Sequence, residues 1–169
     1  MKNILIINQP LSNRGDESAH RSLLRMLDKN FNEAKITVLF LNRKNEDVQD
    51  FVVESPRIVY QNITGFAKGI IFLQRWLLRL NAISLFFLLY PAIRKYAAYI
   101  KKSHVVICAP GGICMGAFQN WSHIFNLYLA KFYKKKLIYY SRSFGPFPIE
   151  TRWNRVFKEI SYKLLSSFD

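Results

Sequence analysis

The feature that most restricts the fold of this chain is a repeated alternation between short apolar runs and amphipathic segments. Apolar runs of strand length occur at residues 4–7, 35–41, 104–110 and 137–140, with a shorter one at 57–60. Strands that are apolar throughout need cover on both faces, and parallel sheets receive that cover from the helices that connect their strands. The pattern therefore predicts an α/β fold, a Rossmann-like doubly wound parallel sheet.

Helical spacing fills the gaps between these runs. Ala19, Leu23, Leu24 and Leu27 recur at helical intervals after Asp16, which we expect to be the N-cap of that helix. Two further helices are predicted at about 121–133 and 150–166. The alternation predicts another strand after the helix at 150–166. We therefore expect the 169 residues to form one domain that is cut short.

The segment at residues 65–100 permits two interpretations. Its core, residues 83–93 (ISLFFLLYPAI), is strongly apolar, but Arg79 and Arg94 flank it, so it is well short of the ~20 residues of a membrane-spanning helix. One interpretation is one or two helices of the crossover that pack in the core, and this is the favoured one. The other is an interfacial helix, with its apolar face in a lipid surface and its bases on anionic headgroups.

The charge distribution is uneven. The net charge is +14, and residues 61–149 contain twelve bases and no Asp or Glu. A stretch of this kind attracts anions such as phosphorylated substrates, anionic lipids or nucleic acid. We expect no nucleic-acid partner, because no recognisable nucleic-acid motif accompanies the charge.

Cys108 and Cys114 could form a disulfide, but two thiols without an export signal favour a reduced, cytoplasmic protein.

Three turns follow predicted strands and should meet at one edge of the sheet. The first, residues 13–17 (NRGDE), leads into a helix and exposes backbone N–H groups that suit an anionic or hydroxylated ligand. The second contains Gly111 and Gly112, and the third is residues 141–147 (SRSFGPF), whose hydroxyl and guanidinium groups can bind sugar hydroxyls or phosphate. Each turn alone is equally well explained as a tight turn, so only their convergence is informative.

Other kinds of site find little support in the sequence. The histidines and cysteines lack metal-ligand spacing, so we expect no metal. The glycines form neither a G-x-G-x-x-G fingerprint nor a phosphate-binding P-loop, so we expect no nucleotide cofactor.

At its three turns the chain resembles the N-terminal half of the polysaccharide pyruvyl transferase family. The resemblance rests on 13–17 (NRGDE), 109–112 (APGG) and 143–147 (SFGPF), which occur in the family's order. The family often has a longer glycine run where this chain has Ala109 and Pro110. Members of the family look like two facing Rossmann-like domains of the GT-B type.

The resemblance implies transfer of a pyruvyl group from phosphoenolpyruvate to two sugar hydroxyls, which forms a ketal in a surface or capsular polysaccharide precursor. It places most donor-binding residues in a second, C-terminal domain, so this chain alone is expected to be inactive. Asp16 is the candidate catalytic residue, because a carboxylate can accept a proton from a sugar hydroxyl. The candidate acceptor-binding residues are Asn13, Gly15, Gly111, Gly112, Ser141, Arg142, Ser143 and Gly145.

The expected partners are phosphoenolpyruvate, a saccharide acceptor on a lipid carrier, and an anionic membrane at the inner face of the cell. Two alternatives stay open. A GT-B glycosyltransferase that uses a sugar nucleotide would share the fold and the basic charge. A non-catalytic module that binds saccharide or membrane would need no second domain.

Overall fold

A computed structural model describes residues 2–9, 14–42, 52–65, 90–113 and 119–166 of the chain. Five strands form one parallel sheet in the order β3-β2-β1-β4-β6. They are β1 (Lys2–Ile7), β2 (Ala34–Leu41), β3 (Ile58–Ile63), β4 (Val105–Cys108) and β6 (Lys136–Tyr139). A second, two-stranded parallel sheet pairs β5 (Gly111–Ile113) with β7 (Arg142–Phe144).

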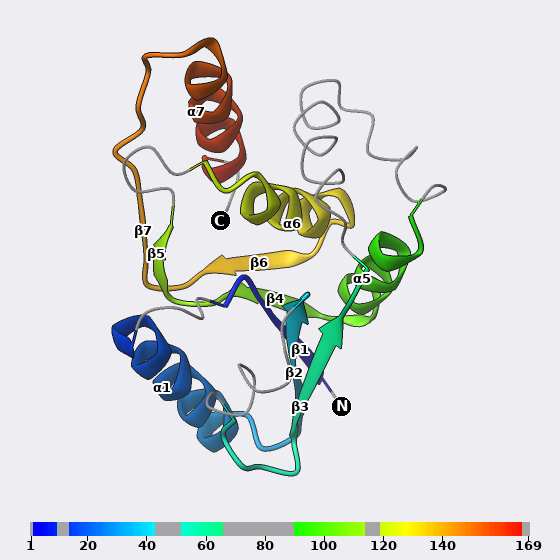
Figure 1. Cartoon of the computed structure of the whole chain (residues 1–169). Coiled ribbons are helices and arrows are strands. Elements are labelled where there is room, and N and C mark those ends of the chain that lie inside the picture. The colour runs from blue at the N-terminus through cyan, green and yellow to red at the C-terminus, as the bar shows by residue number, and fades with distance from the viewer. Residues whose placement is uncertain (1, 10–13, 43–51, 66–89, 114–118, 167–169) are drawn as a thin grey trace.

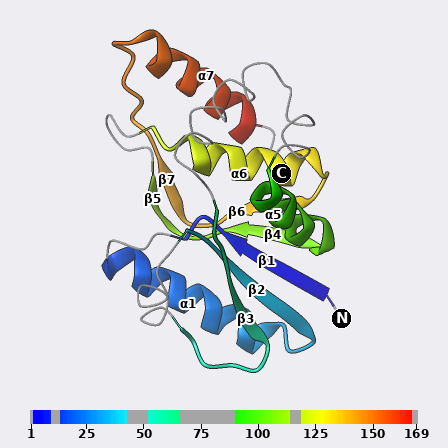
Figure 2. The ribbon, with the colours of Figure 1, turned by 45° about the vertical axis from the view of Figure 1, so that its right-hand side comes forward.

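Helices cover both faces of the five-stranded sheet (Figures 1 and 2). One face is covered by α1 (Arg14–Asn30), and the other by α5 (Pro91–Lys102) and α6 (Trp121–Phe132), with α7 (Arg152–Leu165) packed beyond α6. The sheet is therefore the middle layer of three. This confirms the predicted α/β fold with a parallel sheet, in an arrangement consistent with a Rossmann-like fold.

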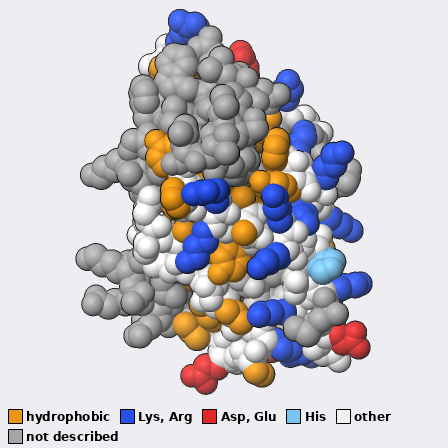
Figure 3. All heavy atoms as spheres, turned by 90° about the vertical axis from the view of Figure 1, so that its right-hand side faces the viewer, with side chains coloured by type: hydrophobic (Ala, Val, Ile, Leu, Met, Phe, Trp, Pro, Cys, Tyr) orange, Lys and Arg blue, Asp and Glu red, His pale blue; other side chains and the backbone are white. Residues whose placement is uncertain are grey.

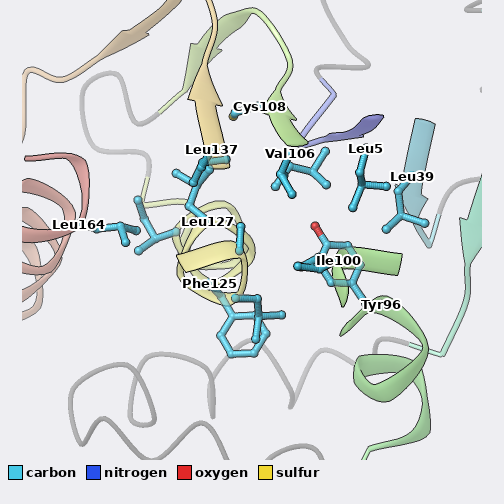
Figure 4. Close-up of a cluster of buried hydrophobic side chains, with 14 of the residues drawn as sticks. Leu5, Leu39, Tyr96, Ile100, Val106, Cys108, Phe125, Leu127, Leu137 and Leu164 are labelled. Atoms are coloured by element: carbon cyan, nitrogen blue, oxygen red, sulfur yellow. The ribbon is translucent and has the colours of Figure 1, made fainter. Parts of the chain in front are cut away.

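Two apolar clusters form the core, one on each face of the sheet. Under α1, the strand side chains pack against Leu23, Leu24 and Leu27, which the helical spacing predicted. On the other face, Leu5, Val106 and their neighbours point toward side chains of α5 and α6 (Figure 4). Because strand side chains alternate between faces, the fully apolar run of β1 supplies both clusters.

Local signals explain where the helices begin. Pro91 lies in the first turn of α5, where its missing N–H is not needed. The Asn120 side chain accepts a hydrogen bond from the His123 N–H (2.9 Å) and so caps α6, and Thr151 does the same for α7 through the Asn154 N–H (3.1 Å). These caps fix the starts of both helices at the edge where the strands end.

Three details differ from the sequence predictions. Asp16 is not an N-cap, because α1 already begins at Arg14 and Asp16 lies in its first turn. Ala19 is exposed rather than part of the buried stripe. The second and third turns contain short strands, β5 and β7, because the two segments leave the main sheet side by side and pair with each other.

The apolar segment is described only from Tyr90 onward, so most of the run at residues 83–93 lies outside the described residues. The described part, α5, packs Ile93, Tyr96, Ala97 and Ile100 into the core. That agrees with the core-packing interpretation for this helix. Within the described ranges, no helix is long and apolar enough to cross a membrane.

Candidate functional site

The candidate site lies at the carboxyl edge of the sheet, where β1, β4 and β6 end together. The register pairs Ile7 with Cys108, and Cys108 with Tyr139. The chain runs from β1 through β2 to β3, and then crosses back to place β4 on the other side of β1. Such a reversal of strand order is the place where open α/β sheets bind ligands.

The pairing of β5 with β7 brings the second and third turns together. Gly111 lies opposite Arg142, and Gly112 opposite Ser143. Gly111 has a φ of 136° and Gly145 a φ of 91°, conformations that side chains rarely allow, so glycine is needed at both positions. The helix that follows the first turn, α1, contacts β5. The described parts of the second and third turns therefore lie side by side, and the placing of the first turn beside them stays a prediction.

The individual site residues differ in how far they can be placed. Asp16 is half-buried, and its carboxylate forms no hydrogen bond or ion pair with a described residue, whereas the neighbouring Glu17 forms an ion pair with Arg21. Gly15, Ser141 and Ser143 are exposed. Asn13 lies outside the described residues, as does Cys114. For Arg142 only the backbone is described, and it lies in β7.

Sequence reasoning missed a buried polar cluster at the same edge, which we call the Asn8–His123 network. Its members come from the ends of β1, β4 and β6 and from α6, and they are Asn8, Cys108, His123, Asn126 and Tyr139. The side chain of Asn126 donates to the Asn8 Oδ1 atom (2.8 Å), and Asn8 in turn donates to the His123 carbonyl (3.3 Å) and to the Cys108 Sγ atom (3.7 Å). Asn8 therefore ties β1 to β4 and to α6.

The imidazole of His123 completes this network. Its Nε2 atom lies 3.4 Å from the Tyr139 hydroxyl and 3.9 Å from the Cys108 Sγ atom. His123 is only 2% exposed, and Asn126 only 4%. The network brings an imidazole, a thiol, a phenol and two carboxamides to the carboxyl edge of the sheet, and its members include no carboxylate. Two signals could have revealed it: Asn8 directly follows an apolar strand, and His123 and Asn126 are spaced i, i+3 on a helix.

A second polar feature lies on α1. A hollow of about 340 Å³ is lined by Arg14, Glu17, Ser18, Arg21 and Arg25. Its three guanidinium groups outnumber its one carboxylate, which is already paired with Arg21. The hollow is therefore electropositive and begins at the helix terminus that leads out of the first turn.

A buried histidine that lies apart from the Asn8–His123 network is also present on α1. His20 is fully buried on the sheet-facing side of α1, and neither ring nitrogen has a hydrogen-bond partner among the described residues. Burial lowers the pKa of His20 from its usual 6.5 to about 4, so the ring is neutral at pH 7.

The described residues include no group of three or more His, Cys, Asp or Glu side chains that could hold a metal ion. Comparison of the chain with protein-family models, with curated proteins and with solved structures finds no match in any of the three.

Proposed function

We propose that this chain is the acceptor-binding half of a polysaccharide pyruvyl transferase. The reaction adds two hydroxyls of a sugar to the enol carbon of phosphoenolpyruvate and releases phosphate, leaving a pyruvate ketal. One hydroxyl proton ends on the methylene carbon, and the other leaves with phosphate. The observation that carries the proposal is the pairing of β5 with β7, because it sets two of the three family-like motifs side by side.

The proposed roles follow from the chemistry of the groups at the carboxyl edge. Asp16 is a carboxylate at this edge without an ion-pair partner among the described residues, so it accepts the proton of an attacking hydroxyl. Gly111 and Gly112 let the acceptor sugar approach the backbone closely. The hydroxyls of Ser141 and Ser143 are exposed and bind sugar hydroxyls, together with Arg142, Gly15, Gly145 and Asn13.

The donor, phosphoenolpyruvate, binds mainly to a second domain of the GT-B type that faces this edge. Phosphoenolpyruvate is a substrate, and the proposed reaction needs no cofactor. The protein acts in the cytoplasm, at the inner face of the cell membrane, where a lipid-linked saccharide presents its hydroxyls to the site. The excess of basic over acidic residues supports this location, because anionic lipids attract such a surface.

Substitution of Asp16 tests the proposed role. Phosphate release from phosphoenolpyruvate is measured with a saccharide acceptor, using this chain together with its second domain. Asp16→Asn should lower kcat/KM by about 100-fold or more, the usual loss on removal of a general base. Glu17→Gln is the matched control, because this adjacent carboxylate is already paired with Arg21 and should retain activity. An Asp16→Asn variant as active as the control would eliminate the role of Asp16.

The sheet order is also that of nucleotide-binding folds, which keeps a sugar-nucleotide glycosyltransferase as the second candidate. Donor competition separates the two. A pyruvyl transferase should release phosphate from phosphoenolpyruvate without inhibition by sugar nucleotides. Turnover of a sugar nucleotide, with none of phosphoenolpyruvate, would replace the first proposal by the second.

A further inference from the structure

The exposed side of α5 carries positive charge along its whole length. Arg94, Lys95, Lys101 and Lys102 are all exposed, while the opposite side of the helix packs into the core. No acidic residue occurs on α5 or anywhere else between residues 61 and 149. The helix therefore presents a purely basic surface.

The end of α6 extends this surface. Lys131, Lys134 and Lys136 are exposed at the point where α6 leads into β6. Lys135 joins the two helix ends, because its Nζ atom donates to the carbonyls of Lys101 (2.7 Å) and Ser103 (2.8 Å). We call these exposed bases of α5 and of the end of α6 the basic face. Figure 3 shows Lys and Arg side chains gathered on this side of the molecule, with hydrophobic side chains between them.

Helix stabilisation explains only part of the basic face. Lysines near a helix C-terminus interact favourably with its carbonyls, which accounts for Lys101, Lys102 and Lys135. Arg94 and Lys95 lie near the N-terminus of α5, where the helix dipole disfavours positive charge, and the first turn holds no acid to offset them. Among the described residues, no carboxylate pairs with any base of this face. Arg94 and Lys95 are therefore left without an opposite charge among the described residues and are available to an external anion.

The surroundings of the bases favour a lipid surface over nucleic acid. The uncharged exposed residues on α5 are Pro91 and Ala98, so its outer side offers no exposed aromatic ring on which bases could stack. At the end of α6, Phe132 is 45% exposed beside Lys131. Because the apolar side of α5 is already buried in the core, the attraction to a membrane is that of clustered Lys and Arg side chains for anionic headgroups.

We propose that the basic face docks the protein on an anionic membrane, with α5 and the end of α6 against the headgroups. This identifies the surface for the membrane location proposed above, and it does not depend on which reaction the carboxyl edge performs. Since α1 covers the opposite face of the sheet, docking through α5 leaves the first turn of α1, with Asp16, uncovered.

Vesicle flotation tests the proposal with matched charge reversals. The purified chain should float with vesicles of phosphatidylcholine and phosphatidylglycerol, but not with phosphatidylcholine alone, and added salt should release it. The triple variant Arg94→Glu, Lys95→Glu, Lys136→Glu should bind more than about 100-fold more weakly, since the loss of each base costs about fivefold and each new carboxylate is repelled by the anionic surface. The control triple, Lys29→Glu, Arg152→Glu, Arg155→Glu, makes the same change in net charge on α1 and α7 and should bind within about fivefold of the unaltered chain.

Each other outcome would overturn the assignment. Equal losses in both triples would mean that net charge alone drives binding. No flotation of the unaltered chain would remove the docking surface, whatever the result of the phosphate-release assay. The chain could instead bind single-stranded RNA more tightly than anionic vesicles and lose this binding only in the Arg94, Lys95, Lys136 triple variant. That result would mean that the basic face binds nucleic acid and not a membrane. Replacing the same three bases by Gln should give an intermediate loss, which keeps the test valid if the Glu variant misfolds.

Discussion

The two faces of the sheet each bury a histidine, and the two histidines have very different neighbours. His20, on α1, is fully buried, and neither of its ring nitrogens has a hydrogen-bond partner among the described residues. His123, on α6, lies within reach of the Tyr139 hydroxyl and the Cys108 thiol, and its carbonyl accepts from Asn8. Both are almost completely buried, so burial alone does not distinguish them.

The difference lies in what each histidine can do. An isolated buried imidazole resists protonation, so His20 acts as a neutral apolar ring and makes the fold sensitive to acid. A hydrogen-bonded imidazole at the carboxyl edge helps to fix the ends of three strands, where the candidate ligand site is built. One face of the sheet therefore uses histidine for packing, and the other uses it within a polar network.

The largest expected effect is the acid sensitivity due to His20. Its pKa is about 4 in the folded state and 6.5 when unfolded, so the unfolded chain binds the proton more readily between these values. The stability that the neutral ring provides is fully present above pH 6.5 and is lost as the pH falls toward 4. The total loss is about 3 kcal/mol, from about 1.4 kcal/mol per pKa unit. Denaturant unfolding at pH 7 and pH 4.5 measures most of this loss, about 2 kcal/mol.

Substitution of His20 shows whether this residue is the cause. His20→Leu should remove about 2 kcal/mol or more of the difference between the two pH values, because leucine cannot bind a proton. Leu24→Ala, at another buried position of α1, should lower the free energy of unfolding equally at pH 7 and at pH 4.5. If His20→Leu retained the full acid sensitivity of the unaltered chain, protonation of His20 would not be the cause of that sensitivity.

The next effect concerns the network around His123. Asn8→Ala removes the side chain that joins Asn126 to the His123 carbonyl, and it places alanine at a φ of 60°, which disfavours it. We expect a loss of about 2 to 3 kcal/mol in the free energy of unfolding, measured in denaturant. Asn8→Gly loses the same hydrogen bonds without the backbone strain, so it should cost about 1 kcal/mol less. Equal effects of the two variants would mean that strain at this position is negligible.

The strands and helices of this fold could be predicted because their signals are local. The apolar run of β1 and the leucine spacing of α1 each follow from a few adjacent residues. The start of α1 was placed wrongly, since Asp16 is a good N-cap by residue type but lies inside the helix. A capping preference of about 1 kcal/mol is easily overridden by the surrounding structure.

The candidate site was predicted only in part, because it depends on contacts between distant segments. The three turns were predicted to converge since parallel strands end at one edge, and that rule needs only the strand assignment. The pairing of β5 with β7 joins segments about 30 residues apart and follows from no pattern within either one. The network around His123 joins Asn8 to residues 100 to 118 positions away, so its members appear unrelated in the sequence.

The smallest expected effect probes the phenol of the network. Tyr139→Phe removes the hydroxyl that lies 3.4 Å from His123 Nε2, and should lower the free energy of unfolding by about 1 kcal/mol, the net value of one hydrogen bond. Tyr140→Phe is the matched control. The side chain of Tyr140, the next residue in the sequence, is exposed, so water replaces any hydrogen bond that its hydroxyl loses. A cost equal to that of the control would show that the Tyr139 hydroxyl is not bonded to His123. The network would then consist of Asn8, Asn126 and the thiol–imidazole pair, and His123 would be closer in character to His20.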